Sequence, residues 1–240
     1  MGQDTRLFIG VMVICNGERV FMPPQRSIAL LFSGGIDSGV LLAELAKEYE
    51  EVYPLYVQNG LRWEKTELLW MKKFLETLRH PSVKPLTLLD LPIQDLQRAH
   101  WSVTGKEVPD EEADDTAVYI PGRNIFLLAK AGVWCNLKDV PRIAIGILKG
   151  NPFPDTTPSF FEAVEESFSR GLRFDISILT PFAHLSKKEV IQRGKDLPLA
   201  LTFSCFDPKG EDHCGRCNKC GERRRAFRNA AVLDKTRYTA

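Results

Sequence analysis

The segment Ser33-Gly34-Gly35-Ile36-Asp37-Ser38 has the residue types and spacing of a phosphate-binding loop. The start of a helix attracts anions because its first N–H groups are free and carry partial positive charge. Two glycines would let the backbone close around phosphate oxygens, and two serines add hydroxyl donors. Asp37 would repel a phosphate, so it is better suited to cap the loop or to hold a Mg²⁺ ion that bridges phosphates. A plain glycine turn between a strand and a helix is the alternative.

A second group with chemical potential is a cluster of four cysteines near the C-terminus. They are Cys205, Cys214, Cys217 and Cys220. Four thiolates suit a structural Zn²⁺ ion in a closed tetrahedron, and an iron–sulfur cluster is the alternative because it uses the same ligands. His213 is adjacent to the cluster and is interpreted as a bystander. The remaining cysteines, Cys15 and Cys135, are isolated and are predicted to be core thiols, which is typical of a reducing cytoplasm.

The segment Tyr119-Ile-Pro-Gly-Arg-Asn124 combines a turn with a cation. Pro121 and Gly122 favour a turn, which places Arg123 near the start of the helix predicted to follow. A cation opposes the helix dipole there, so its presence indicates an anion in front of the helix. A solvent-facing arginine is the alternative. Asn124 is a natural N-cap as well as a possible ligand contact.

The elements that must position these residues alternate along the chain. Short apolar runs predict strands at residues 27–32, 51–57, 83–89, 142–147 and 176–180. Helical spacing of apolar residues predicts helices at residues 38–48, 64–78, 124–137 and 159–170, and a further helix from the Ser186–Glu189 capping box to Gly194. This alternation predicts an α/β fold with a doubly wound, mostly parallel sheet that is covered on both faces.

An extra hairpin is predicted at the N-terminus. Residues 6–14 and 19–22 flank Asn16-Gly17, a pair that favours a tight turn. We therefore expect three parts: a hairpin extension at 1–26, a nucleotide-binding domain at 27–200 and a zinc-binding segment at 201–240. The hairpin would serve as an oligomer contact or as an extension of the sheet.

The composition is that of an ordinary globular protein. Hydrophobic residues make up 44% of the chain and charged residues 26%, and the net charge is +1. This charge gives no sign of a nucleic-acid or membrane surface patch. No apolar run is long enough for a membrane span, and the N-terminus lacks the features of a signal peptide, so a cytoplasmic protein is expected. The acidic run at residues 110–115 is interpreted as a solvated loop, with a lid as the alternative.

The loop at residues 33–38 is similar to the PP-loop of the N-type ATP pyrophosphatase superfamily, whose members cleave ATP between its α and β phosphates. Within that superfamily the chain resembles the 7-cyano-7-deazaguanine synthase family, from about Ser27 to Phe227. The resemblance rests on several short segments. They are Ser33–Ser38, Tyr119–Asn124, Pro154-Asp155, Leu185–Glu189 and the cysteine segment from Ser204 to Cys220.

The resemblance implies an adenine nucleotide alpha hydrolase-like fold and assigns roles to residues. Ser33–Ser38 would bind ATP with Mg²⁺, and the four cysteines would hold zinc. Ser33, Asp37 and Arg123 would act in catalysis. The substrate would be bound by Arg123, Asn124, Phe153 and Asp155.

The reaction implied is that of an ATP-dependent ligase in queuosine biosynthesis. The carboxylate of 7-carboxy-7-deazaguanine would be adenylated, and ammonia would displace AMP to give the amide. A second ATP would activate the amide oxygen, and loss of AMP would leave the nitrile 7-cyano-7-deazaguanine. A chain of 240 residues has no room for a glutaminase domain, so ammonia would be free or delivered by a partner. A homodimer is expected.

The segment Leu148–Asp155 departs from the family pattern, Asp-aromatic-Ser-Gly-Tyr-Pro-Asp. The loop is shorter and lacks the first acidic residue, and Phe153 replaces the tyrosine as a stacking platform. Arg62-Trp63 likewise replaces Arg-His. Because lost polar groups at a base-reading loop alter substrate recognition, the activated acid could instead be joined to another amine, on a protein for example. The chain could also be a different amidating or thiolating PP-loop enzyme, or a zinc-ribbon module that binds nucleic acid through Arg223-Arg224-Arg225.

Overall fold

The computed structural model describes residues 11–15, 18–22 and 25–240, with side chains described from Arg26 onward. Five strands form one sheet in the order β5-β4-β3-β6-β7, and every neighbouring pair is parallel. The strands are β3 (Gln25–Leu31), β4 (Tyr49–Gln58), β5 (Thr87–Asp90), β6 (Arg142–Ala144) and β7 (Ser177–Leu179). The predicted α/β fold with a parallel sheet is confirmed.

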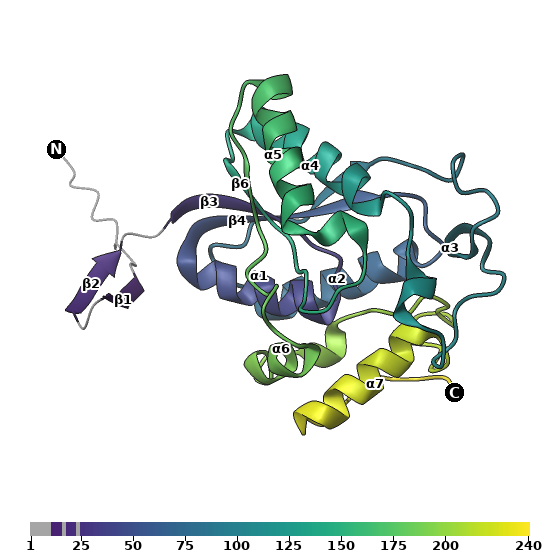
Figure 1. The fold of residues 1–240 in the computed structure, drawn as a ribbon. Coiled ribbons are helices and arrows are strands. Elements are labelled where there is room, and N and C mark those ends of the chain that lie inside the picture. Colours follow the sequence, from purple (N-terminus) through teal and green to yellow (C-terminus); the bar gives the residue numbers. More distant parts are fainter. Residues whose placement is uncertain (1–10, 16–17, 23–24) are drawn as a thin grey trace.

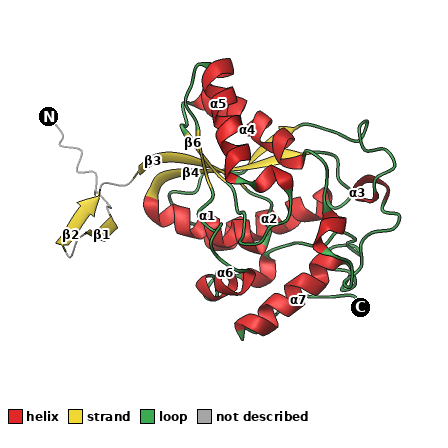
Figure 2. Ribbon diagram, viewed as in Figure 1, coloured by secondary structure: helices red, strands yellow, loops and turns green. Residues whose placement is uncertain are grey.

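Helices cover both faces of this sheet (Figures 1 and 2). They are α1 (Ile36–Glu48), α2 (Glu64–Leu78), α3 (Trp101–Thr104), α4 (Arg123–Lys138), α5 (Pro158–Leu172), α6 (Lys187–Arg193) and α7 (Asn218–Ala230). Helices α4 and α5 lie on one side of the sheet, and α1, α2, α6 and α7 lie on the other (Figure 1). Each of the five predicted helices is present, and the Ser186–Glu189 capping box forms as expected.

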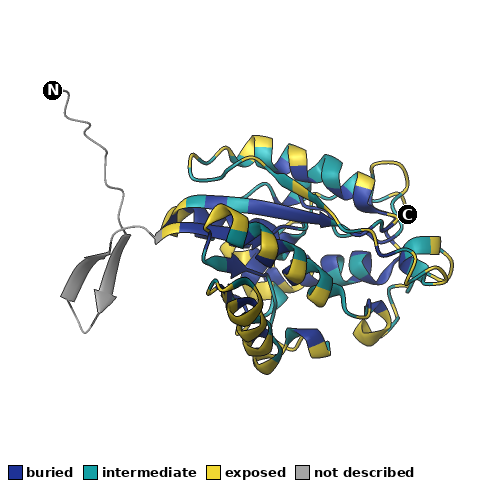
Figure 3. Ribbon diagram, turned by 90° about the horizontal axis from the view of Figure 1, so that it is seen from above, coloured by how far each residue is buried: buried dark blue, intermediate teal, exposed yellow. Residues whose placement is uncertain are grey.

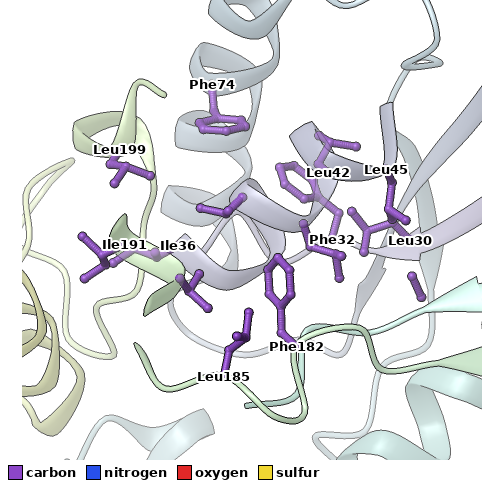
Figure 4. Close-up of a cluster of buried hydrophobic side chains, with 14 of the residues drawn as sticks. Leu30, Phe32, Ile36, Leu42, Leu45, Phe74, Phe182, Leu185, Ile191 and Leu199 are labelled. Atoms are coloured by element: carbon purple, nitrogen blue, oxygen red, sulfur yellow. The ribbon is translucent and has the colours of Figure 1, made fainter. Parts of the chain in front are cut away.

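Two cores result, one on each side of the central strand β3. Ile28, Leu30 and Phe32 pack into the cluster under α1, α2 and α6, whereas Ala29 and Leu31 pack into the cluster under α4 and α5. Figure 4 shows the first cluster, and Figure 3 shows that the buried sheet is flanked by helices with exposed outer faces. This burial on both faces explains why the chain from Ile28 to Phe32 is a continuous apolar run.

Three strands are shorter than the sequence predicted. The strand predicted at 176–180 forms over Ser177–Leu179. The predicted strand at 142–147 ends at Ala144, because the chain then leaves the sheet and Ile147 N–H turns back to the carbonyl of Ile145, at 3.0 Å. The predicted strand at 83–89 pairs over Thr87–Asp90, and Val83 makes an isolated bridge with Val52. Residues 145–147, which were predicted to belong to the strand at 142–147, line a cavity instead.

The predicted N-terminal strands pair antiparallel as β1 (Val11–Cys15) and β2 (Glu18–Met22). Within the described residues they form a sheet of their own rather than an extension of the main sheet. The Asn16-Gly17 turn, residues 6–10 and the side chain of Cys15 lie outside what the structure describes. Cys135 is fully buried in the core, as predicted. No helix in the described ranges is both long enough and apolar enough to cross a membrane.

Candidate functional site

The loop between β3 and α1 lies where the strand order of the sheet reverses. β3 has β4 on one side and β6 on the other, and open α/β sheets bind ligands beyond the carboxyl ends of their strands at such a point. Ser33 Oγ lies 3.2 Å from Ser38 Oγ and accepts a long hydrogen bond of 3.5 Å from Gly35 N–H. No side chain of the described residues caps α1, so its first N–H groups are available to an anion.

Gly34 and Ile36 shape this loop in different ways. Gly34 has a φ of +70°, and a Cβ atom there would lie 2.4 Å from Cγ of Met71, so both the backbone and the packing require glycine. The Ile36 side chain is 2% exposed and lies in the hydrophobic cluster with Phe182 and Leu185 (Figure 4). Ile36 therefore offers the loop its backbone, and its side chain anchors the start of α1.

Asp37 is ion-paired with a lysine that the sequence interpretation did not select. Lys187 Nζ, in the first turn of α6, lies 2.6 Å from Asp37 Oδ2. The other oxygen, Oδ1, is buried and has no hydrogen-bond partner in the described part of the chain. The sequence does contain a signal for Lys187. This lysine directly follows the N-cap residue Ser186, so it places a cation at the start of a helix, where the helix dipole is unfavourable to it. The same argument had selected Arg123.

A shared carboxylate ties α6 to α7 at this loop. Glu222 Oε2 lies 2.6 Å from Lys219 Nζ, and Glu222 Oε1 lies 3.4 Å from Lys187 Nζ. Burial alone would raise the pKa of Glu222, but the two lysines outweigh burial and lower the pKa to about 2. Burial would lower the pKa of Lys187, but attraction to Asp37 and Glu222 raises it. Both groups are therefore charged at neutral pH, and Lys187 is held facing the loop.

Three cavities meet at this end of the sheet. The strand-end cavity, of about 200 Å³, lies beyond β3, β4 and β6 and is lined by Tyr56 and residues 145–147. The loop cavity, of about 220 Å³, is lined by the loop at residues 33–37 and by Lys187. The Phe153 cavity, of about 150 Å³, is lined by Tyr119, Phe153 and Asp155.

Arg123 borders all three cavities. Its Nε atom is buried and has no hydrogen-bond partner among the described residues, which argues against the solvent-facing alternative. Burying a guanidinium donor without a partner is costly. The arrangement therefore favours an anionic ligand at the junction of the three cavities.

The Phe153 cavity has an aromatic wall and a buried carboxylate. The rings of Phe153 and Tyr119 stack at 5.2 Å with an interplanar angle of 29°. Asp155, 6% exposed, accepts a 3.0 Å hydrogen bond from Asn124 N–H, and the Asn124 side-chain amide donates to the carbonyl of Asp155 at 2.9 Å. Asp155 thus also stabilises the start of α4.

The prediction that Asn124 is the N-cap of α4 is wrong. Gly122, with a φ of +71°, occupies the N-cap position, and the helix begins at Arg123. The left-handed turn at Gly122 starts the helix earlier than expected, and the stabilising carboxylate comes from Asp155, a residue distant in sequence. Asn124 still lines the strand-end and Phe153 cavities.

A buried carboxyl group that the sequence interpretation missed lies on α2. Glu67 is 6% exposed, and its Oε2 atom accepts a 2.6 Å hydrogen bond from the Tyr56 hydroxyl. It lines the loop cavity. Burial raises its pKa to about 7, against the attraction of Arg123. The signal was its place in the helical pattern, because Glu67 falls on the same face as Met71 and Phe74, which are fully buried.

The four cysteines lie together and are all buried. Their sulfur atoms are within 4.8 Å of one another. The separations are 3.9 Å for Cys205–Cys217, 3.9 Å for Cys214–Cys220 and 3.5 Å for Cys217–Cys220. Four sulfurs bound to one Zn²⁺ at about 2.3 Å would be about 3.8 Å apart. Backbone N–H groups also point at the sulfurs, for example Cys214 N–H to Cys205 Sγ at 3.2 Å. The cluster fits one tetrahedral metal ion.

His213 stands apart from the four sulfurs, as its interpretation as a bystander requires. Its Nε2 atom accepts a 3.4 Å hydrogen bond from Ser204 N–H. Its ring packs against Phe203, with the ring centroids 4.6 Å apart. His213 therefore supports the polypeptide around the cluster.

The acidic run is largely solvated, as predicted, since Asp110, Glu112, Asp114 and Asp115 are exposed, but Glu111 attaches it to α7. Glu111 pairs with Arg224, and the Glu111 carbonyl accepts from Arg225 at 3.1 Å. Arg223 is 1% exposed and donates to Thr202 Oγ1 at 2.9 Å. The run is therefore held against α7 by one acidic residue, whose charge is opposite to that of Arg224. The three arginines are engaged within the chain, which removes the observation that favoured a nucleic-acid-binding module.

Comparisons with known proteins show the family of this chain. The family model described as "Queuosine biosynthesis protein QueC" matches residues 27–231. A 7-cyano-7-deazaguanine synthase from Acidobacterium capsulatum is 33% identical over 233 residues, covering 90% of this chain and 99% of the relative. One from Methanocaldococcus jannaschii is 33% identical over 236 residues, covering 89% and 99%.

Among solved structures, the chain is similar to the U34-tRNA thiolase NcsA from Methanococcus maripaludis with its 4Fe-4S cluster. The TM-score is 0.48 at 12% identity, covering 86% of this chain and 68% of that chain. The fold and the resemblance predicted from the sequence are confirmed by the sheet order and by the family match. The chain belongs to the QueC family of queuosine biosynthesis proteins.

Proposed function

We propose that this chain is an ATP-dependent ligase that adenylates the carboxylate of 7-carboxy-7-deazaguanine and converts it with ammonia to the amide and then to the nitrile 7-cyano-7-deazaguanine. The names of its relatives support the substrate class. The observation that carries the proposal is the position of Arg123, with its buried, unpartnered Nε at the junction of three cavities in the described chain. A ligase must bring a nucleotide, an acid and an amine to one point.

ATP would occupy the strand-end and loop cavities. The nucleoside would lie beyond the carboxyl ends of β3, β4 and β6, and the phosphates would accept hydrogen bonds from the backbone of residues 33–38 and from the two serine hydroxyls. Lys187 and Arg123 would neutralise phosphate charge. Asp37 Oδ1, buried and without a partner among the described residues, is suited to hold Mg²⁺, which would further neutralise the phosphates.

The deazaguanine ring would occupy the Phe153 cavity. A flat ring can stack on the Phe153 side chain, in the manner in which Tyr119 stacks there. Asp155 has a carboxylate suited to the N–H donors of a guanine-like edge, although one of its oxygens already accepts from Asn124. The substrate carboxylate would then point toward Arg123, between the base and the nucleotide.

The residues would act mainly by holding charges in place. The carboxylate oxygen attacks the α-phosphorus, and pyrophosphate leaves toward Lys187, which Asp37 and Glu222 keep protonated. Arg123 would neutralise both the carboxylate and the phosphate as they approach. Such fixed charges lower the barrier because they need no reorganisation during the reaction. Ammonia then displaces AMP.

We also propose that the four cysteines hold one structural Zn²⁺. Three of the six sulfur separations are 3.5 to 3.9 Å and all are within 4.8 Å, which supports a single ion shared by all four ligands. A four-iron cluster would place each thiolate on a different iron and separate the sulfurs more widely. Zinc would stabilise the segment at 201–240, whose helix α7 presents Lys219 and Glu222 to the loop cavity. We assign residues 27–200 to ATP and acid binding, and we expect a homodimer in the cytoplasm.

The test is acid-dependent exchange of labelled pyrophosphate into ATP. We expect exchange with 7-carboxy-7-deazaguanine in the wild type and its loss in Asp37→Ala, with Ser33→Ala less affected because backbone N–H groups share the role of Ser33. Arg170→Ala, on the exposed end of α5, is the control. Normal exchange in Asp37→Ala would contradict the assignment. Exchange that yields a stable adenylate with ammonia present would favour a different amine acceptor.

A further inference from the structure

The loop cavity is the remaining route to the reacting carbon once an acyl adenylate is bound. Under the proposed function, AMP fills the strand-end cavity and the deazaguanine ring fills the Phe153 cavity. Arg123 borders both and also borders the loop cavity. After pyrophosphate leaves, the amine can therefore approach the carbonyl carbon from the loop cavity.

Three carboxyl groups line this cavity, and they differ in their partners. Asp37 is paired with Lys187 at 2.6 Å, and Glu222 is paired with both Lys187 and Lys219. Glu67 has no ion pair among the described residues. Its hydrogen bond is the 2.6 Å bond from the neutral Tyr56 hydroxyl. Glu67 is thus the carboxyl group of the cavity that is not neutralised by a lysine.

The surroundings of Glu67 suit proton transfer to and from a small ligand. Trp63, Phe203 and Phe206 also line the cavity and limit its access to water. Burial is the main influence on the Glu67 carboxyl and raises its pKa to about 7; Arg123, Tyr56 and Trp63 lower the pKa, and Glu64 raises it. The other charged groups on the cavity wall are Asp37, Lys187, Lys219, Glu222 and Arg223. A carboxyl group with this pKa can both accept and release a proton near neutral pH.

We propose that Glu67 is the base that binds the ammonium ion and removes its proton for the amide-forming step. Ammonium is the dominant form of ammonia near neutral pH, and it has no lone pair with which to attack. The inference rests on the proposed function, because it needs an acyl adenylate to be attacked. It makes Glu67 a catalytic residue in contact with the nucleophile.

Ammonium gives one proton to the Glu67 carboxylate, and the lone pair of the resulting ammonia forms the C–N bond at the carbonyl carbon. The bond between that carbon and the AMP oxygen breaks, and its electron pair leaves with AMP. A second proton passes from the nitrogen to AMP or water, and Glu67 returns its own proton to water for the next cycle.

The test measures the two half-reactions separately in the full chain. Wild type, Glu67→Gln, Tyr56→Phe and the control Glu76→Gln, which lies on the exposed face of α2, are each assayed for pyrophosphate exchange. Amide formation is then measured with ammonium chloride on both sides of neutral pH. Hydroxylamine, which is uncharged near neutral pH and needs no base to expose its lone pair, replaces ammonium in a parallel series.

We expect Glu67→Gln to keep the exchange reaction and the hydroxylamine reaction but to lose about 100-fold in rate with ammonium. Tyr56→Phe removes a hydrogen bond that lowers the pKa of Glu67, so its rate should rise with pH at a higher pH than in the wild type. If Glu67→Gln fails to fold, this shift in the pH profile of Tyr56→Phe tests whether Glu67 is the base.

An unchanged ammonium rate in Glu67→Gln, or equal losses with ammonium and hydroxylamine, would overturn the inference and leave adenylation standing. A pH profile in Tyr56→Phe identical to that of the wild type would also overturn it. Absence of exchange in the wild type would overturn the proposed function, and the inference with it.

Discussion

The buried Glu67 carboxyl makes stability depend on pH in a defined direction. Its pKa is raised by burial from 4.5 to about 7 in the folded protein. Between these values the folded state holds a proton that the unfolded state has released, so stability is present at low pH and is lost as pH rises toward about 7. Glu67→Gln keeps the size of the side chain and an acceptor for Tyr56, but it cannot ionise.

The size of the effect follows from the shift in pKa. Ionising Glu67 destabilises the folded protein by about 3 kcal/mol once both states are fully charged, and about 2.5 kcal/mol of this appears between about pH 5 and pH 8. Relative to the wild type, Glu67→Gln should therefore be more stable at the higher pH by about that amount than at the lower pH. For a chain of this size the midpoint of thermal unfolding should differ by roughly 5–10 °C.

The assay is thermal or urea unfolding of wild type and Glu67→Gln at both pH values, followed by circular dichroism. Comparing the two proteins cancels the titration of all other groups. Glu76→Gln, exposed on the same helix, should follow the wild type at both pH values. The same difference between wild type and Glu67→Gln at low and high pH would refute the reasoning, because it would mean that Glu67 ionises in the folded protein as it does in water.

Further variants test other parts of the site. Cys217→Ser should lose the metal, measured by elemental analysis, and lower the stability of the C-terminal segment, because metal binding contributes directly to folding; full zinc content would contradict this. Gly34→Ala should strain the loop at a φ of +70° and crowd Met71, so pyrophosphate exchange should fall by at least about 10-fold. Asp155→Asn should raise the KM for the acid far more than that for ATP; if thermal stability alone falls, Asp155 serves α4 and not the substrate.

Local sequence patterns predicted helices and strands well where the residues of the element itself determine its bounds. Residues 64–78 were predicted as a helix and form α2 with those bounds. The apolar side chains whose spacing predicts the helix are the ones that face the sheet. The Ser186–Glu189 capping box is likewise local. The end of the predicted strand at 142–147 is not determined by its own residues, because it depends on where the neighbouring strand β7 ends.

The candidate site was predicted only in part, because only some of its residues carry a signal in the sequence around them. The loop at 33–38, the four cysteines and Arg123 carry their signals in short segments. The pairing of Asp37 with Lys187 joins residues separated by 150 positions, and the bond between Asn124 and Asp155 joins residues separated by 31. The burial of Glu67 depends on how α2 packs beside β4, whose Tyr56 hydroxyl donates to the Glu67 carboxyl group. Such relations become visible only when the tertiary structure brings the segments together.

The central claim, adenylation and amidation of a deazaguanine carboxylate, is tested most directly by mass spectrometry of the products. The chain is incubated with 7-carboxy-7-deazaguanine, ATP and ammonium, and the amount of AMP released is compared with the amount of product. We predict the nitrile, with two AMP released for each molecule formed and with the amide as an intermediate. Unchanged acid together with no AMP formation would contradict the account.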